Sequence, residues 1–573
     1  MRLLASTALL VALVFPAVSA DAKPKARSKR SVAAKRVIKR TPVDPQKLGA
    51  HARVSYQRAG ELRPTVDIEP RRPEPLTAEE EAAASIQKLL RGPVLRKGVT
   101  GLFVADARTG EPLFAVNATD PMNPASNVKL ISTATALELL GPDFRYPTRV
   151  LGPSPVGGTV PGDIYLLGSY DPTLSASDLH EIAAAMARSG ITTITGNVAV
   201  GSDRTRDGIY RSLIPIEITA GEPGEPPIAI GPADHPLVEI AVTATTAKRA
   251  MRPRLTYKTA VTKTPTGQPR ITLTIGGTIG KGGTTMYPLW TKQRTANAAY
   301  ALMAALRAHG ISITGDLKVT ELGDFVGDTV LRGGLPVELG RHESQPLADI
   351  VSRVNKRSVN WLADRVIMTA AALAKHTQPS MQVALDAMYN WLSRHPHIAK
   401  GGVTIDTGSG LSYRTQITPM DLVSVVRAAG GFAGETDSKL AQAWRSSLSV
   451  AGTDGTLRSR FRGTNAAGRI HGKTGTLSTV IAISGILDID PTRPLAFALV
   501  TNGDGPLAKP LVRRAHEQVV AEICKYLSKT SNTTPIQTQP THATPPALPD
   551  GADIELDEST PDAVLDAETA ATK

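Results

Sequence analysis

The sequence predicts an α/β (α+β) chain in which an antiparallel sheet with helices is interrupted by a large, mainly β insertion. Strand-like runs occur near both ends of the ordered region, at 99–106, 112–116, 478–489 and 494–502. Helical patterns dominate residues 347–429. Residues 145–330 differ from both, because they are rich in Thr, Gly, Pro and β-branched residues. The early and late strands can share one sheet if the middle is an insertion.

The composition describes a chain with enough apolar residues for a sizeable core. Of its 573 residues 41% are hydrophobic, and 65 Lys and Arg against 52 Asp and Glu give a formal net charge of +13. At roughly 150 residues per domain the length allows three or four domains, and it excludes a peptide or a disordered protein. The single cysteine, Cys524, excludes an internal disulfide and a cysteine-based zinc cluster.

Both ends of the chain resemble segments outside the folded part. Residues 1–20 combine Arg2, an apolar run and small residues at a cleavage site, which is typical of a secretory signal peptide. Residues 21–76 form a basic, disordered linker that is either a solvated spacer or a peripheral contact with an anionic membrane. Residues 529–573 form a disordered acidic tail. Export and an aromatic share of only 4% argue against a nucleic-acid partner.

The ordered elements follow in sequence from a capping-box pattern that starts a helix over 77–90. A second helix, 126–140, carries one apolar stripe and ends at a Gly-Pro pair. We expect one domain to be assembled from 77–144 and 331–528. The segment 145–330 is then inserted into it as a mainly β domain or domains.

A short sequence pattern occurs twice inside the insertion. Residues 188–197 and 307–316 share the order Arg, Gly-Ile, Ile-Thr-Gly and then Asn or Asp. Each follows a helical pattern and leads into a strand. The repeated pattern predicts a repeated helix–strand unit within the insertion.

The first chemical motif is Ser126-Asn127-Val128-Lys129, at the start of the long helix. A spacing of three places Ser126 and Lys129 on one helix face. A serine hydroxyl is a weak nucleophile until a base takes its proton, and a lysine held neutral by burial or a neighbouring cation can be that base. The motif alone is common, and a solvated lysine is its ordinary reading.

Two further motifs lie at element boundaries. Ser358-Val359-Asn360 joins two predicted helices and offers a hydroxyl to relay a proton and an amide to hold a substrate carbonyl. Lys473-Thr474-Gly475-Thr476 leads towards a strand and offers a cation and two hydroxyls to a carboxylate. Gly475 there lets a substrate backbone approach. Each motif is weak alone, but the three together in this order are specific.

This set resembles the S-x-x-K, S-x-N and K-T-G motifs of the penicillin-recognising serine enzymes. The distance of 232 residues from Ser126 to Ser358, filled by the insertion, is similar to that of the low-molecular-mass class C penicillin-binding proteins, the D-alanyl-D-alanine carboxypeptidase/endopeptidases. The resemblance covers about residues 77–528. Further matching segments occur in the family's order: 124–126, 140–144, 168–174, 407–412 and 452–457.

The resemblance implies a transpeptidase-like domain that hydrolyses D-alanine-containing peptidoglycan peptides and cross-links in the periplasm through an acyl-serine. It implies catalytic roles for five residues: Ser126 as nucleophile, Lys129 as base, Ser358 and Asn360 as proton relay and acyl-chain holder, and Lys473 beside the substrate carboxylate. It implies that substrate is bound by Thr474, Gly475 and Thr476. No cofactor is required, and β-lactam antibiotics are expected as covalent inhibitors.

Two positions depart from the family's pattern. Many members carry a tryptophan-flanked aspartate in the insertion, where this chain offers only Glu217 or Glu222. The family often has arginine directly after Gly-Leu-Ser, whereas here Tyr413 precedes Arg414. Specificity for the cross-link is therefore left open by the sequence.

Two other functions remain as alternatives. A β-lactamase needs a dedicated base for the deacylating water, and no clear Glu-x-x-x-Asn pattern occurs in residues 370–470. A catalytically inert peptidoglycan-binding scaffold is opposed by the intact motif residues. Fast turnover of penicillin would distinguish a β-lactamase from the carboxypeptidase/endopeptidase. Release of D-alanine would distinguish the carboxypeptidase/endopeptidase from an inert scaffold.

Overall fold

The computed structural model describes residues 77–201, 213–231, 237–264, 267, 269–395, 403–434, 438–490 and 492–530. The expected signal peptide and basic linker, and the acidic tail beyond residue 530, lie outside these ranges. Within them, no helix combines the length and the hydropathy required to cross a bilayer.

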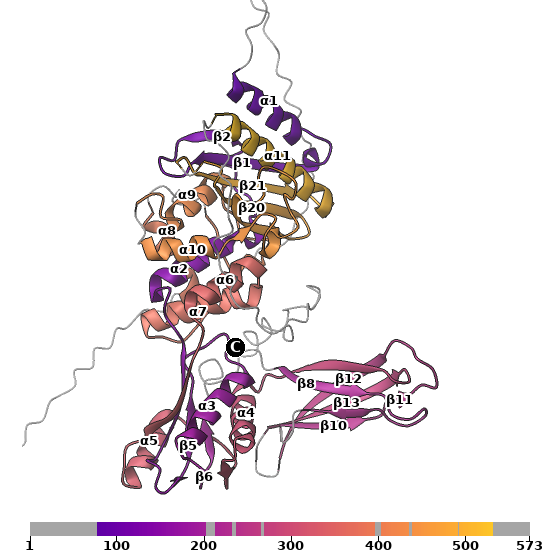
Figure 1. Ribbon diagram of the computed structural model, residues 1–573, viewed down its shortest axis with the longest axis vertical. Helices are drawn as coiled ribbons and strands as arrows, with labels where there is room; N and C mark the ends of the chain where they lie inside the picture. Colours follow the sequence, from indigo (N-terminus) through magenta and orange to yellow (C-terminus); the bar gives the residue numbers. More distant parts are fainter. Residues whose placement is uncertain are drawn as a thin grey trace, which may run out of the picture. The chain divides into compact units, whose positions relative to one another are not determined.

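A six-stranded antiparallel sheet joins the two ends of the described chain (Figure 1). Its strands, in spatial order, are β18 (Ser449–Val450), β19 (Ile470–Thr476), β20 (Val480–Leu487), β21 (Leu495–Gly503), β1 (Gly98–Asp106) and β2 (Pro112–Val116). All nine residues of β1 pair with β21. The expectation that early and late strands share one sheet is confirmed.

The central strands are buried on both faces, because successive side chains enter two different helical layers. On β1, Phe103 and Ala105 enter one core while Leu102 and Val104 enter the other. The first core is completed by six helices: α2 (Lys129–Leu140), α6 (Leu347–Arg357), α7 (Asn360–Lys375), α8 (Met381–Ser393), α9 (Pro419–Ala429) and α10 (Ser438–Ser446). The second is closed by α1 (Ala78–Leu90) and α11 (Lys509–Thr530) (Figure 1).

Helix starts follow the expected caps, with one instructive difference. The capping box of α1 is present, since Thr77 Oγ1 accepts from the Glu80 N–H at 3.2 Å and Glu80 Oε2 accepts from the Thr77 N–H at 2.8 Å. The helix expected from Ser126 begins instead with a 3₁₀ turn, η3 (Ala125–Val128), and becomes α-helical at Lys129. Ala125 adopts a positive φ of 47°, and its N–H donates to Asn123 Oδ1 at 2.8 Å.

The segment between α2 and α6 builds separate sheets. A five-stranded sheet has the order β16 (Leu317–Val319), β7 (Val198–Val200), β5 (Ile164–Leu167), β3 (Pro147–Gly152) and β17 (Val337–Glu343). A small sheet has the order β15 (Ser312–Ile313), β6 (Thr193–Ile194) and β4 (Thr159–Val160). Three helices accompany them: α3 (Ala176–Arg188), α4 (Arg294–Ala308) and α5 (Leu322–Leu331).

The remaining strands of the insertion form two further sheets. One contains β10 (Val238–Val242), β13 (Pro269–Ile279), β11 (Thr245–Thr246) and β12 (Arg254–Lys263). The other contains β14 (Thr284–Trp290), β8 (Leu213–Thr219) and β9 (Ile228–Ile230). Strands therefore outnumber helices between α2 and α6, and β17, which lies beyond the expected boundary at residue 330, pairs with β3 of the insertion.

The predicted repeat is confirmed by the pairing of its two copies. The two strands after α4 pair in parallel with the two strands after α3. In β15 and β6, Ser312 lies opposite Thr193, and in β16 and β7, Leu317 lies opposite Val198. The turns also touch, because the Asp316 N–H donates to Asn197 Oδ1 at 3.0 Å. The two helix–strand units thus stack edge to edge in register and bury α3 and α4 against shared strands.

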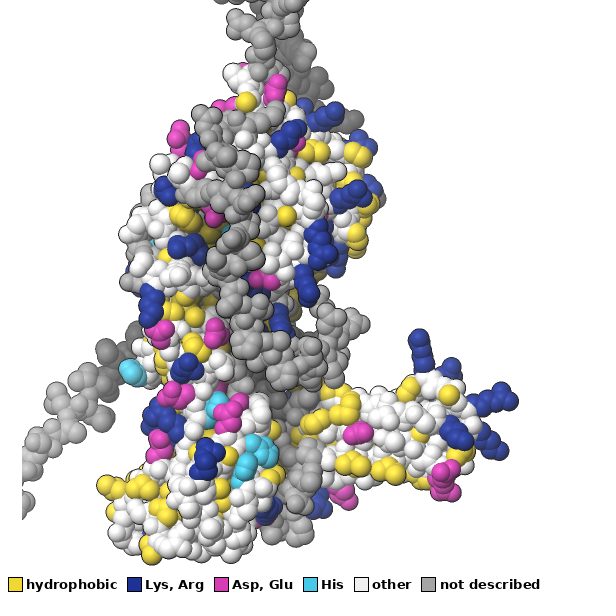
Figure 2. All heavy atoms as spheres, in the orientation of Figure 1, with side chains coloured by type: hydrophobic (Ala, Val, Ile, Leu, Met, Phe, Trp, Pro, Cys, Tyr) yellow, Lys and Arg dark blue, Asp and Glu magenta, His cyan; other side chains and the backbone are white. Residues whose placement is uncertain are grey.

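Positive charge gathers at one end of the β10–β13 sheet, where Figure 2 shows a group of Lys and Arg side chains. The exposed members are Lys248, Arg249, Arg252, Arg254 and Lys281. The Lys281 N–H donates to the Arg249 carbonyl at 3.1 Å, which brings the two basic turns together. Part of the chain's net charge of +13 is therefore concentrated on the insertion.

Candidate active site

The nucleophile expected from the sequence lies at the entrance to the buried helix α2. Ser126 is partly exposed in η3, whereas Lys129, the first residue of α2, is fully buried. Lys129 Nζ lies 3.0 Å from Ser126 Oγ. The 3₁₀ turn therefore keeps the serine accessible while its lysine stays in the core.

The amine of Lys129 has two further partners, and both can only accept hydrogen bonds. Nζ donates to Asn360 Oδ1 at 2.7 Å and to the Ser409 carbonyl at 2.7 Å. A neutral amine has two N–H bonds and one lone pair, so these two acceptors take both of its N–H bonds. The lone pair is then left for the hydroxyl of Ser126, which is the geometry that a general base requires.

The second pair of motif residues meets on the other side of the site. Lys473 Nζ donates to Ser358 Oγ at 2.7 Å and to the Thr474 carbonyl at 2.8 Å. Ser358 sits between α6 and α7 in the left-handed region, with φ 56° and ψ 38°. A non-glycine residue in that region costs free energy, and such strain persists where the surroundings fix the side chain.

The electrostatics of the site are set by two buried amines. The pKa of Lys473 is lowered well below its ordinary value, first by complete burial and second by the positive charge of Lys129. Each ammonium disfavours the other, so the pair favours a state in which one amine is uncharged. Burial and the neighbouring charge therefore both favour the uncharged amine at Lys473.

Two glycines let neighbouring segments close against the nucleophile. A Cβ on Gly475 would lie 2.5 Å from the Pro124 carbonyl oxygen and 2.8 Å from Asn127 Nδ2. A Cβ on Gly410, at φ +75°, would lie 2.1 Å from the Ala125 carbonyl oxygen. Strand β19 and the loop 407–412 therefore contact the Ser126 segment closely, and neither position accepts a side chain without displacing that segment.

The hydroxyls of the K-T-G-T run have different partners. Thr474 Oγ1 donates to Thr456 Oγ1 at 2.9 Å, in the segment 452–457. Thr476 Oγ1 accepts from the guanidinium of Arg513 at 3.1 Å. The structure thus brings Ser126, Lys129 and Asn360 into one hydrogen-bonded set and Ser358 with Lys473 into another, while Gly475 packs against the nucleophile's own turn.

One buried carboxylate beside this site was not identified from the sequence. Asp364 lies four residues after Asn360 on α7, and its Oδ1 accepts from the Ser409 N–H at 2.7 Å. Burial raises the pKa of Asp364, and the Ser409 hydrogen bonds and the charge of Lys129 oppose that rise. Asp364 therefore fixes the loop whose carbonyl accepts from Lys129. The i, i+4 spacing from Asn360 was the only local signal.

The residues that depart from the family's pattern have partners of their own. Tyr413 places its hydroxyl 2.7 Å from Ser478 Oγ, just beyond β19. Arg414 donates to Asp406 at 3.0 Å, and its side chain is 85% exposed. Glu217 and Glu222 are both exposed. Within the described ranges, neither carboxylate forms a hydrogen bond or ion pair with the motif residues of this site.

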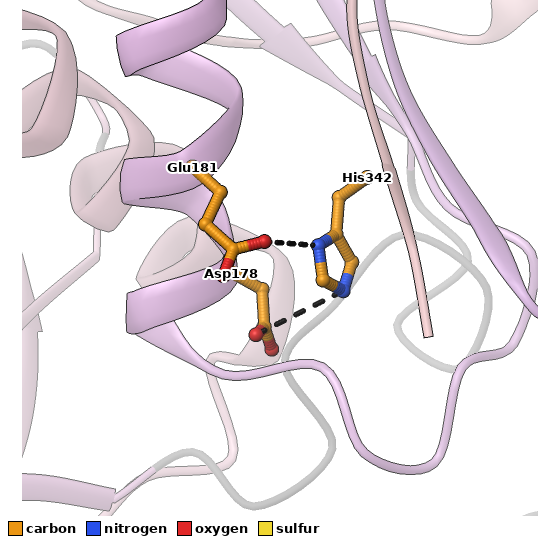
Figure 3. Close-up of side chains that lie close together, drawn as sticks. All are labelled: Asp178, Glu181 and His342. Atoms are coloured by element: carbon orange, nitrogen blue, oxygen red, sulfur yellow. Dashed lines mark hydrogen bonds and ion pairs between the residues drawn. The ribbon is translucent and has the colours of Figure 1, made fainter. Parts of the chain in front are cut away.

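A group with metal-ligating side chains lies away from these motifs, between α3 and β17 (Figure 3). The two ring nitrogens of His342 face different carboxylates: Nδ1 lies 3.0 Å from Glu181 and Nε2 lies 3.8 Å from Asp178. One ion cannot bind both nitrogens of a single ring. Asp178 also caps α3 by accepting from Ser175 N at 2.7 Å. This arrangement suits a clamp between helix and strand better than a metal centre.

Comparison with known proteins identifies related chains over most of this length. A family model described as the D-Ala-D-Ala carboxypeptidase 3 (S13) family matches residues 82–207 and 208–523. The D-alanyl-D-alanine carboxypeptidase of an Actinomadura species is 31% identical over 467 residues, covering 74% of this chain and 82% of that protein. Carboxypeptidase DacB of Mycolicibacterium smegmatis is 28% identical over 415 residues, covering 71% and 77%.

A solved structure shares the fold. Penicillin binding protein 4 from Haemophilus influenzae, crystallised with a novel β-lactam, superposes with a TM-score of 0.58 at 20% identity. The match covers 77% of this chain and 99% of that one. The predicted fold, a penicillin-binding domain with helices around an antiparallel sheet and an extra inserted region, is confirmed.

The position of Asp364 yields a prediction about the loop that it holds. Replacing Asp364 by Ala removes the acceptor for the Ser409 N–H, so the Ser409 carbonyl shifts from Lys129 and the acylation rate constant with benzylpenicillin falls on the order of 10²-fold. Asp364→Asn keeps an acceptor oxygen and stays within a few-fold of the parent. The rate is followed by intact-protein mass against time.

The exposed Asp386, on α8, provides the matched control through Asp386→Ala, which should leave the rate unchanged. Thermal melting of each variant separates loss of folding from loss of rate. An Asp364→Asn variant as slow as Asp364→Ala would contradict the positioning role and assign the effect to charge instead.

Proposed function

The chain belongs to the D-Ala-D-Ala carboxypeptidase 3 (S13) family, and we propose that it hydrolyses peptidoglycan peptides next to D-alanine through an acyl-serine intermediate. Its substrates are stem peptides that end in D-Ala-D-Ala, together with cross-links that contain the same D-alanyl bond. The reaction uses side chains only, with no metal or organic cofactor in any step.

One observation carries this proposal more than any other. Lys129 Nζ contacts two acceptors, Asn360 Oδ1 and the Ser409 carbonyl, and lies 3.0 Å from Ser126 Oγ. That contact set supports a neutral lysine as the base that activates the serine.

Acylation begins when Ser126 Oγ attacks the carbonyl carbon of the penultimate D-alanine. The hydroxyl proton passes to Lys129 Nζ as the C–O bond forms, and the tetrahedral intermediate carries the negative charge. Asn360 retains the protonated lysine through Oδ1. Ser126 is thereby esterified only after the leaving amine has accepted a proton.

The leaving amine takes the hydroxyl proton of Ser358, Ser358 takes a proton from Lys473, and the proton held by Lys129 replaces that one, so Lys129 is uncharged again. Ser358 Oγ accepts from Lys473 Nζ at 2.7 Å, so its own hydroxyl proton is free to be directed at the amine nitrogen. The C–N bond then breaks and D-alanine leaves with its carboxylate beside Lys473, Thr474 and Thr476. Water subsequently attacks the ester and gives a proton to Lys129, which returns that proton to Ser126 Oγ as the shortened peptide leaves.

A β-lactam presents the same carboxylate and a strained amide, so it acylates Ser126 in the same way. Its leaving group stays covalently attached to the acyl chain and obstructs the water, which makes the adduct persistent. β-Lactam antibiotics are therefore expected to be covalent inhibitors of this chain.

We also propose that the protein acts outside the inner membrane, in the periplasm, where peptidoglycan is accessible. The support is the signal-peptide pattern of residues 1–20. Export with cleavage after Ala20 predicts a mature chain that begins at Asp21. N-terminal sequencing of protein recovered from a periplasmic fraction checks this, and an intact Met1 in that fraction would contradict cleavage.

The nucleophile is tested by the intact mass of the protein after incubation with benzylpenicillin. The parent chain gains one benzylpenicillin mass, and Ser126→Ala gains none. Ser393→Ala, an exposed serine at the end of α8, forms the adduct like the parent. Release of free D-alanine from a pentapeptide by the parent, and not by Ser126→Ala, then establishes the hydrolase.

The same experiment separates the alternatives. Rapid loss of benzylpenicillin without a lasting adduct would identify a β-lactamase. Peptidoglycan binding with neither adduct nor D-alanine release would identify an inert scaffold. Activity on a D-alanyl cross-linked dimer, compared with activity on the pentapeptide, gives the balance of endopeptidase and carboxypeptidase work.

A further inference from the structure

Arg513 brings a cation to the end of the K-T-G-T strand from an element that carries none of the motifs. It lies in α11, and its guanidinium donates to Thr476 Oγ1 at 3.1 Å. Thr476 is the last residue of β19, two positions beyond Thr474 and therefore on the same face of the strand. The side chain of Arg513 is partly buried, so the contact is held within the packed molecule.

The charge of this guanidinium is not neutralised by the part of the chain that the structure describes. No Asp or Glu in the described ranges forms an ion pair with Arg513, and its side chain bonds only to the neutral hydroxyl of Thr476. The nearby acid of the same helix, Glu517, accepts instead from Arg460 Nε at 2.6 Å. A guanidinium has five N–H donors in a planar fork that matches a carboxylate, and most of these donors remain available here.

The arginine that follows Gly-Leu-Ser and Tyr413 does not supply this cation. Arg414 is engaged with Asp406 and its side chain is 85% exposed. Tyr413, which stands between, contributes a hydroxyl to Ser478, and the Ser478 N–H donates back to that hydroxyl at 3.3 Å. At the end of β19 the described side chains therefore offer an arginine from α11 and a tyrosine from the 407–414 segment.

We propose that Arg513 binds the terminal carboxylate of the substrate, acting with the hydroxyl of Thr476. The inference rests on the proposed function and names the residue that selects substrates with a free C-terminal carboxylate. No bond is made or broken by Arg513: its guanidinium places two N–H donors on the carboxylate oxygens, and the Thr476 hydroxyl turns from accepting Arg513 to donating to the same group. Charge-assisted bonds of this kind discriminate strongly between a carboxylate and its neutral ester.

Benzylpenicillin and its methyl ester provide the test, because they differ only in that charge. Arg513→Ala lowers the acylation rate constant for benzylpenicillin roughly 10- to 100-fold, the range of a lost hydrogen bond to a charged group, while the rate constant for the ester changes little. Arg513→Lys restores part of the discrimination. Arg514→Ala, at the adjacent exposed arginine whose side chain forms no hydrogen bond or ion pair within the described ranges, changes neither rate.

Binding of a peptide ending in D-Ala-D-Ala to the Ser126→Ala protein, measured by calorimetry, gives the same comparison without any chemistry. Adding Arg513→Ala to that background weakens binding of the acid and leaves binding of the C-terminal amide unchanged. Equal losses for acid and neutral probe, or no loss for either, would overturn the role of Arg513. Failure of the proposed function looks different, because the parent then forms no adduct whatever Arg513 contributes.

Discussion

The amine of Lys129 is the point on which the remainder of this site depends. A fully buried lysine must have its N–H bonds satisfied, and here the acceptors come from the start of α7 and from the loop 407–412, both far from Lys129 in the chain. Satisfying them fixes three segments around Ser126. In the uncharged amine, the same two contacts take both N–H bonds and leave the lone pair for Ser126 Oγ, 3.0 Å away, so the contacts that satisfy the buried lysine also position it as a base.

A second buried lysine, Lys473, lies on the other side of the site. Lys473 is buried on β19, and the positive charge of Lys129 adds to burial in lowering its pKa. The left-handed Ser358, fixed between α6 and α7, lies 2.7 Å from the second amine and is partly exposed. The backbone strain therefore lies at the residue that we propose passes the proton to the leaving group.

Much of this arrangement is readable from sequence where the signal is local. Capping boxes, Gly-Pro stops and the repeat of the 188–197 pattern in 307–316 predicted α1, the end of α2 and the paired helix–strand units, because each depends on residues close together in the chain. The helices α5 and α10 were not predicted, since both are short and lack a long apolar stripe. Asp364 and Arg513 were missed for another reason: each acts through a partner 37 or more residues away, and no local pattern distinguishes them from ordinary helix residues.

The most direct test of a neutral lysine base is the pH dependence of the acylation rate constant with benzylpenicillin, measured by intact-protein mass from about pH 5 to 10. The proposed mechanism requires Lys129 to be uncharged when it takes the Ser126 proton, so the rate constant is predicted to rise and become level below the ordinary lysine range of about 10.4. Lysine bases of ordinary pKa would instead give a rate constant that continues to rise about tenfold per pH unit through pH 9. That result would contradict the account.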